Sequence, residues 1–296
     1  MNSEKIIPPK PHNYGVKRIF SSLEDIAGKK ITVMGLGLHG GGEASTRFFL
    51  KHGAYVTVTD MKSEQELSPS VASLMQDSSL DTSRLKLVLG KHDIADFINA
   101  DCVIKNPIVK YDGNKYLAAA QHIESDISIF LQFTASPIIA VTGSKGKSST
   151  ASAVCYGLNK AGKKTLLGGN ITVSPLTFLD DTLAKNNNPE ALPIVVLELS
   201  SWQLADLRGR KLLNPHIALI TKIIPDHQNW YGDMTAYTDD KKLIYADQSS
   251  QQMLLCSSNT DFGDIADKSN SRVFRYPEDI PVSLQCGFEK NIGWLD

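Results

Sequence analysis

The sequence predicts an α/β fold with parallel sheets, because the order strand, glycine-rich loop and helix occurs twice along the chain. The first such unit spans residues 30–53 and the second spans residues 137–162. The two loops lie about a hundred residues apart, an ordinary domain size. The 296 residues also suffice for two domains. We therefore expect one domain in residues 1–134 and a second in residues 135–296.

The first unit begins with the apolar strand 30–34, which runs into the G-x-G-x-x-G sequence of residues 35–40. A helix over residues 43–53 follows and ends at a glycine. The next strand, residues 54–59, ends at Asp60, and an acid at this place accepts hydrogen bonds from a nucleotide's ribose or base in Rossmann-like folds. Alternatively, the glycines serve only close packing of the helix on the strand. The predicted contacts of this Rossmann-like site are Gly35, Leu36, Gly37 and Asp60.

The rest of the first half adds further strands and helices. We expect a helix near residues 71–75, a strand at 85–89 and another at 100–105. The polar turn after this last strand makes Asn106 a candidate ligand contact, because open parallel sheets bind ligands beyond the carboxyl ends of their strands. Apolar residues at helical spacing predict a helix over residues 122–133.

The second unit is a phosphate-binding loop. The β-branched strand 137–142 runs into Gly-Ser-Lys-Gly-Lys-Ser, and a helix over residues 151–162 follows. Loop amides and the helix N-terminus would cradle phosphates, Lys147 would neutralise their charge, and the Ser148 hydroxyl could ligate magnesium. The loop is two residues shorter than the common form, and the alternative is a lysine in an ordinary turn. The predicted ATP contacts are Gly143, Ser144, Lys145, Gly146, Lys147, Ser148 and Ser149.

Two further strands of the second half end in polar residues. Glu198 closes the apolar run 194–197, and such an acid opposite a phosphate loop often holds a metal or water. His227 lies just beyond the strand 216–221, where a neutral imidazole could bind a second cation. Each has a simpler interpretation, a buried acid with a structural partner for Glu198 and a structural histidine for His227.

The predicted helix over residues 235–245 places Tyr237, Lys241 and Ile244 on one face. The alternative for Lys241 and its neighbour is that both lysines are solvated. From residue 253 onward the pattern predicts short strands.

Composition excludes several classes of partner. The chain has 31 Lys and Arg against 32 Asp and Glu, so no overall field favours nucleic acid or an anionic membrane. No apolar run approaches the length of about 20 residues that crosses a bilayer, and the four cysteines show no C-x-x-C pair. We therefore expect a cytoplasmic monomer that binds neither nucleic acid nor membrane.

These motifs together resemble the Mur ligase family, and within it the D-glutamate-adding ligases most closely. The short phosphate loop, Gly168-Gly169-Asn170-Ile171 and Pro225-Asp226-His227 fall in family order, followed by Lys241 with Ile244. The most discriminating string is Glu-Leu-Ser-Ser-Trp-Gln-Leu at residues 198–204. The resemblance runs from about Ile31 to about Ile244 and implies a Mur ligase central domain in residues 135–296.

The resemblance implies a separate role for each group of residues. The first domain would bind the UDP part of UDP-N-acetylmuramoyl-L-alanine, with help from Asn106. Lys241, rather than the adjacent Lys242, matches a lysine that the family carbamylates, which makes it an oxygen ligand for a hard metal. Asn170, Ser200 and Gln203 would hold the rest of that substrate. The implied catalytic residues are Lys147, Glu198, His227 and Lys241, and the implied Mg²⁺ ligands are Ser148, Glu198, His227 and carbamylated Lys241.

The implied reaction uses ATP to convert a carboxylate into an acyl phosphate, which the amine of D-glutamate attacks to give an amide, ADP and phosphate. Magnesium and Lys147 would offset the charge that builds up between the two anions. The implied cofactors are therefore ATP and Mg²⁺, and no protein nucleophile is required.

The sequence departs from the family pattern in three places. Ile108 stands where the family commonly has glycine, and Lys222 stands where it usually has asparagine. The chain also ends before the remainder of the central domain and a third domain that closes over ATP. We therefore expect negligible D-glutamate ligation from these 296 residues, and an in-frame extension to restore it.

Three hypotheses follow from the sequence. The first is an incomplete D-glutamate-adding ligase, and the second is a module that binds UDP-sugar peptide and ATP without ligating them. The third is a nicotinamide oxidoreductase, which rests on G-x-G-x-x-G alone. A second phosphate loop with a matching acid, histidine and lysine argues against the third.

Overall fold

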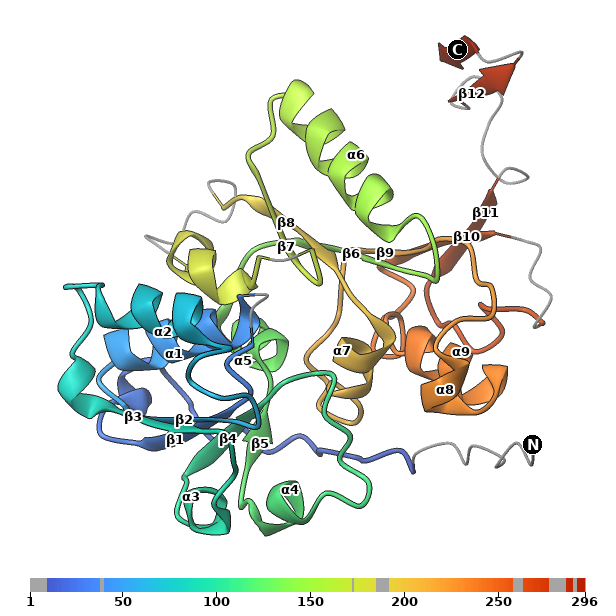
Figure 1. Cartoon of the computed structure of the whole chain (residues 1–296). Coiled ribbons are helices and arrows are strands. Elements are labelled where there is room, and N and C mark those ends of the chain that lie inside the picture. The colour runs from blue at the N-terminus through green and yellow to red at the C-terminus, as the bar shows by residue number, and fades with distance from the viewer. Residues whose placement is uncertain are drawn as a thin grey trace.

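The computed structural model describes residues 10–37, 40–171, 173–184, 192–257, 263–276, 286–289 and 292–295. It contains two wholly parallel sheets, so the predicted α/β fold is confirmed (Figure 1). The first sheet has the order β3-β2-β1-β4-β5, and we call residues 10–133 the N-terminal region. Its strands are β1 (Lys30–Met34), β2 (Tyr55–Asp60), β3 (Leu85–Leu89), β4 (Cys102–Lys105) and β5 (Ile123–Glu124).

The second sheet has the order β11-β10-β9-β6-β8-β7, and we call residues 138–276 the central region. Among the described strands, none of the first sheet pairs with one of the second. A separate antiparallel hairpin joins β12 (Cys286–Glu289) and β13 (Ile292–Leu295). The strands of the second sheet are β6 (Ile138–Thr142), β7 (Thr165–Gly169), β8 (Ile194–Glu198), β9 (Ile217–Ile220), β10 (Met253–Ser257) and β11 (Arg272–Tyr276).

The α-helices differ from the predicted ones in number and in some boundaries. Four short helices of four or five residues, α3, α4, α7 and α8, were not expected from the sequence. No helix in the described part of the chain is long and apolar enough to cross a bilayer. The helices are α1 (Gly41–Lys51), α2 (Ser68–Met75), α3 (Ile94–Ile98), α4 (Lys115–Ala119), α5 (Asp126–Phe133), α6 (Lys147–Lys160), α7 (Ser201–Ala205), α8 (Gln228–Tyr231) and α9 (Met234–Lys242).

Two predicted helix starts were wrong. The helix expected from residue 122 begins at Asp126, because Ser125 and Ser128 form a capping box there and residues 123–124 pair with β4 instead. Helix α6 begins at Lys147 rather than at residue 151, directly from the phosphate loop. The first turn of α6 therefore carries the loop's own lysine and serines.

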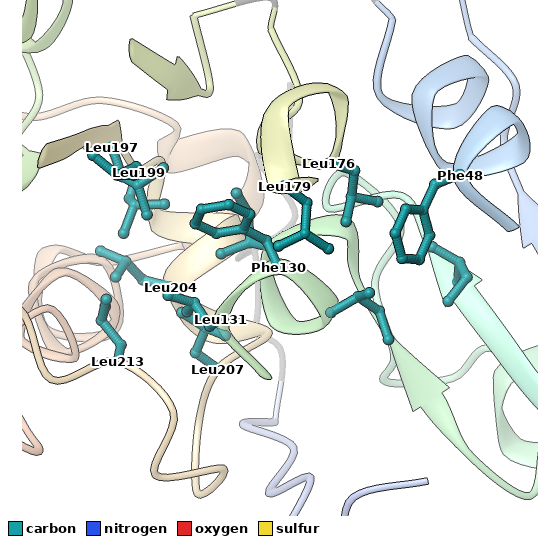
Figure 2. Packing of buried hydrophobic residues seen from close by; sticks show 14 of the residues in the cluster. Phe48, Phe130, Leu131, Leu176, Leu179, Leu197, Leu199, Leu204, Leu207 and Leu213 are labelled. Atoms are coloured by element: carbon teal, nitrogen blue, oxygen red, sulfur yellow. The ribbon is translucent and has the colours of Figure 1, made fainter. Parts of the chain in front are cut away.

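The two regions share one buried hydrophobic cluster. Figure 2 shows Phe130 of α5 near Leu179 of a 3-10 helix (Pro175–Thr182) in the central region, and Leu131 of α5 near Leu204 and Leu207. Phe48 of α1 belongs to the same cluster. Side chains packed at interior density hold the regions in one arrangement. The cavity described below therefore combines residues from both.

Candidate functional site

A cavity of about 720 Å³ lies beyond the carboxyl ends of β1 and β4, between the two regions. In the first sheet, β1 lies between β2 and β4, the strand-order reversal at which open α/β sheets bind ligands. Residues predicted from separate motifs line this one cavity. They are Gly35, Gly37, Asp60 and Asn106 from the N-terminal region, and Asn170, Ser200 and Gln203 from the central region.

The glycine loop of the N-terminal region packs closely on its neighbours. A Cβ on Gly42 would lie 2.1 Å from the carbonyl oxygen of Gly35, so α1 can begin this close to the loop only with glycine. Leu36 does not line the cavity, because its side chain is fully buried in the core. The loop therefore offers Gly35 and Gly37 to the cavity, and the contact of Leu36 with the UDP moiety stays a prediction.

Asp60 already holds backbone groups at the mouth of this cavity. Its Oδ2 accepts a hydrogen bond from the amide of Gly37 at 3.1 Å, and its Oδ1 accepts one from the amide of Lys62 at 2.9 Å. A carboxylate has about four acceptor positions, so a ligand hydroxyl or imide can share these oxygens. Asp60 thus shapes the glycine loop as well as facing the cavity.

Asn106 forms a local turn at the end of β4. Its Oδ1 accepts from the amide of Ile108 at 3.1 Å, which leaves its amide group for other partners. Ile108 is 55% exposed and lines the cavity. The turn therefore forms with isoleucine and presents an apolar side chain to the cavity.

The opposite wall is the start of α7. Ser200 and Gln203 form a capping box, in which the Gln203 amide donates to Ser200 Oγ at 3.2 Å and the Ser200 amide donates to Gln203 Oε1 at 3.0 Å. This reciprocal pair fixes both side chains on a helix only five residues long. The Ser200 hydroxyl also donates to Gln203 Oε1 at 3.3 Å, and both residues line the cavity.

The phosphate loop is held by backbone contacts with the residue after β9. Gly143 has φ +144°, and a Cβ there would lie 1.9 Å from Thr221 Oγ1. The Thr221 hydroxyl donates to the carbonyl oxygen of Lys145 at 2.7 Å. Gly146, at φ +88°, is the N-cap of α6. Only glycine fits at position 143, so this part of the motif has a steric cause.

The hydroxyl of Ser144 makes hydrogen bonds within the central region. It donates to the carbonyl oxygen of Ile224 at 2.9 Å and accepts from the hydroxyl of Tyr237 at 3.0 Å. The side chain therefore ties the loop to the rest of the region, and the Ser144 amide donates to the carbonyl oxygen of Lys222 at 2.9 Å. Ser148 and Ser149 are exposed on the first turn of α6.

Two lysines converge on the phosphate loop. Lys147 Nζ donates to the carbonyl oxygen of Ser144 at 3.1 Å, and burial lowers the pKa of Lys147 while Glu198 opposes the shift. Lys241, only 1% exposed, donates from Nζ to the carbonyl oxygen of Gly143 at 2.8 Å. Burial first, and the charge of Lys147 second, lower the pKa of Lys241 to about 7. The adjacent Lys242 points elsewhere and pairs with Asp267 at 2.9 Å.

Glu198 links the cavity to the phosphate loop. It is 1% exposed, and its Oε1 accepts from the side-chain amide of Asn170 at 2.9 Å. Its Oε2 is buried without a hydrogen-bond partner. A buried carboxylate oxygen without a partner is costly, so Glu198 fits the role of a ligand for a cation.

His227 fits that role less well. Its backbone has φ +51° and caps α8, and its ring packs on Trp202 with centroids 4.7 Å apart. The described residues contain no group of three or more His, Cys, Asp or Glu side chains placed to hold a metal ion. The predicted set of Ser148, Glu198, His227 and carbamylated Lys241 is of a different type, since it needs a hydroxyl and a modified lysine.

Sequence reasoning missed several residues of the cavity wall. Trp202 and Lys105 both line it, and Asp126 lines it with its Oδ2 accepting from the hydroxyl of Ser174 at 2.9 Å. Lys105 and Asp126 gave no sequence signal, because each resembles an ordinary charged residue beside an apolar run. Trp202 lies within the string that carries the resemblance and was the one detectable omission.

The sequence has clear relatives. Residues 141–285 match the model of the Mur ligase middle domain. The chain is 47% identical over 274 residues to the UDP-N-acetylmuramoylalanine--D-glutamate ligase of Treponema pallidum (strain Nichols), covering 86% of this chain and 49% of the relative. It is 42% identical to the ligase of the same name from Borreliella burgdorferi (strain ZS7), covering 91% and 56%. The chain thus spans about half the length of these curated relatives.

A solved structure shows the same fold. The ligase named UDP-N-acetylmuramate:L-alanyl-gamma-D-glutamyl-meso-diaminopimelate ligase, from Neisseria meningitides, superposes with a TM-score of 0.56. The match covers 84% of this chain and 78% of that one at 19% sequence identity. At this identity the likeness concerns the architecture.

Proposed function

The chain belongs to the Mur ligase family, and we propose that it serves the ATP-dependent addition of D-glutamate to UDP-N-acetylmuramoyl-L-alanine in peptidoglycan precursor synthesis. The observation that supports this most directly is the hydrogen bond between Asn170 and Glu198. Asn170 lines the cavity between the regions, and Glu198 acts electrostatically on Lys147 of the phosphate loop. A substrate carboxylate and a nucleotide phosphate would therefore meet near this pair.

In the proposed reaction, the carboxylate of the L-alanine end attacks the γ-phosphorus of ATP, and ADP leaves. The amine of D-glutamate then attacks the carbonyl carbon of the acyl phosphate, an amide bond forms, and phosphate and a proton are released. Lys147 and the backbone amides of the first turn of α6 would stabilise the transferring phosphoryl group through positive charge and N–H donors. The cavity would hold the UDP-sugar peptide through Gly35, Gly37, Asp60 and Asn106.

Magnesium, bound through Glu198 and the Ser148 hydroxyl, would supply charge neutralisation at the phosphates. Lys241 would join as a carbamate, in which its neutral amine forms an N–C bond with carbon dioxide and releases a proton to solvent. Burial favours this step, because a pKa of about 7 leaves much of the amine neutral at neutral pH. The carbamate would have to replace the present bond of Nζ to Gly143.

Calorimetry with UDP-N-acetylmuramoyl-L-alanine and, separately, with ATP and magnesium tests the proposal. We expect both to bind, with Lys147→Met affecting only ATP and Asn106→Ala affecting only the UDP compound. A phosphate-release assay with D-glutamate added then separates a ligase from the alternative of a module that binds both without reaction. Failure of the UDP compound to bind at millimolar concentration would contradict the proposal.

A further inference from the structure

Two ion pairs with deeply buried side chains connect the N-terminal region to the central region. Lys105, at the end of β4, has its Nζ 3.0 Å from Asp206 Oδ1, and the two side chains are 3% and 5% exposed. Arg210 has its Nη1 2.9 Å from Oε2 of Glu124 in β5, with exposures of 4% and 3%. Burial of four charges is expensive, and apolar residues of similar volume often stabilise a protein equally well. The cost of burying these two ion pairs therefore points to a role other than stabilising the fold.

The ammonium group of Lys105 holds the turn that carries Asn106. It donates to the carbonyl oxygens of Asn106 at 3.0 Å, Pro107 at 3.3 Å and Val109 at 2.9 Å, besides pairing with Asp206. An ammonium group has three N–H donors, and these four acceptors already use them. Although Lys105 lines the substrate cavity, it has no donor left for a ligand phosphate.

Asp206 lies next to the opposite wall of the cavity. It directly follows α7, whose first turn carries Gln203 and its capping partner into the cavity. The hydroxyl of Tyr14 donates to Asp206 Oδ1 at 3.2 Å, and Arg210 Nε donates to its backbone carbonyl at 2.6 Å. Arg210 thus holds the backbone of Asp206 within the central region, while Tyr14 and Lys105 of the N-terminal region both bind its carboxylate. The pair with Lys105 joins the two elements that face each other across the cavity.

We propose that Lys105 is a positioning residue, whose ion pair with Asp206 sets the distance between the Asn106 turn and α7 and so the fit of the UDP-sugar substrate. This inference rests on the proposed function for the identity of that substrate. The pair with Glu124 has no such role, since neither Arg210 nor Glu124 lines the cavity. Glu124 provides the control, and Arg210 stays in place because it also bonds to the backbone carbonyl of Asp206.

The test compares one double variant and one single control variant with the unchanged chain. Lys105→Met with Asp206→Leu removes both charges, so no unpaired buried charge remains to prevent folding. Glu124→Gln removes the charge of the control pair and keeps an acceptor for Arg210, whose bond to the Asp206 carbonyl remains. Calorimetry measures affinity for UDP-N-acetylmuramoyl-L-alanine and for ATP, thermal unfolding measures stability, and hydrogen exchange follows the amides of Ile108 and Val109, which donate to Asn106.

For the double variant we expect affinity for the UDP compound to fall about tenfold, the usual size of a coupling between sites. ATP affinity stays unchanged, and exchange at Ile108 and Val109 becomes faster. The control variant changes stability without these effects. Unchanged substrate affinity and unchanged exchange in the double variant would overturn the inference, as would an equal loss in the control.

The proposed function can fail separately. If the unchanged chain does not bind the UDP compound, the assigned substrate is wrong. The exchange measurement still decides the positioning role, because it needs no ligand. Exchange at Ile108 and Val109 that is as slow in the double variant as in the unchanged chain overturns that role.

Discussion

The phosphate loop and the substrate cavity are built in different ways. The loop is formed by consecutive residues after β6 and is fixed by neighbours in the same sheet, such as Thr221. The cavity is formed by turns and helix ends from both regions, joined by side-chain pairs such as Lys105 with Asp206. A site made from one stretch is sensitive to single backbone changes there. A site made between regions is sensitive to residues that never touch the ligand.

The sharpest test of this comparison is Gly143→Ala. The new Cβ would clash with Thr221 Oγ1 in a backbone conformation that side chains rarely adopt. We expect ATP affinity to fall by about 100-fold or more and stability to fall by about 1 to 3 kcal/mol. Calorimetry with ATP and chemical denaturation measure both effects.

Gly37→Ala is the matched control from the other glycine loop. Gly37 also has a positive φ, +63°, but no atom lies within 4 Å of the site of its Cβ. We expect a cost of about 1 to 2 kcal/mol from the left-handed conformation and no change in ATP affinity. Equal losses of stability and of ATP affinity in the two variants would show that a Cβ is accommodated no worse at Gly143 than at Gly37.

A second test concerns the buried lysine at the phosphate loop. The pKa of Lys241 is lowered to about 7 from 10.5, so the unfolded state binds more protons between these values, and stability rises with pH across this window. Relative to Lys241→Met, the chain should gain a few kcal/mol between pH 7 and pH 10, at about 1.4 kcal/mol for each unit of pKa shift. Denaturation in buffers free of carbon dioxide measures the difference. Parallel pH profiles of the two proteins would contradict the prediction.

Lys147→Met removes a positive charge from the phosphate loop and leaves the substrate cavity unchanged. Loss of a hydrogen bond to a charged group costs about 1.5 to 3 kcal/mol, so ATP affinity should fall by that amount. Affinity for the UDP compound should not change, because Lys147 does not line the cavity. Lys145→Met serves as the control, since Lys145 is a mostly exposed lysine of the same loop. Equal losses of ATP affinity in the two variants would indicate that ATP responds to the overall positive charge of the loop rather than to a direct contact with Lys147.

Asp60→Ala tests the cavity from its N-terminal wall. We expect affinity for the UDP compound to fall by about 1 to 3 kcal/mol, because ligand polar groups and the amides of Gly37 and Lys62 lose their acceptor. ATP affinity should not change. Asp60→Asn retains one acceptor oxygen and should lose less. Calorimetry that finds the alanine variant unaltered would remove Asp60 from the site.

The features predicted best from the sequence are those that depend on residues adjacent along the chain. The bounds of β1 agree with the structure, and Glu198 ends β8 as expected, because apolar runs ended by glycine or acid are local patterns. The short helices α3 and α4 were not predicted, since five residues give too little periodicity.

The remaining parts depend on contacts between distant residues. Lys105 and Asp206 are a hundred positions apart, and no periodicity in one stretch indicates such a partner. The inward direction of Leu36 and the structural bonds of the Ser144 hydroxyl likewise depend on what the fold brings beside them. The site's residue types could be predicted, but the interactions that hold them could not.

The hydroxyl of Ser144 joins three segments at one atom. It bonds to both backbone groups of Ile224, just before the turn that carries His227, and it accepts from Tyr237, one helical turn before Lys241. A loop held in this way has little disorder to lose when a nucleotide arrives, so binding keeps more of its favourable free energy. The phosphate loop, the histidine turn and the lysine helix would also shift as a single rigid body. A bound nucleotide that shifts the phosphate loop would then move the His227 and Lys241 side chains with it.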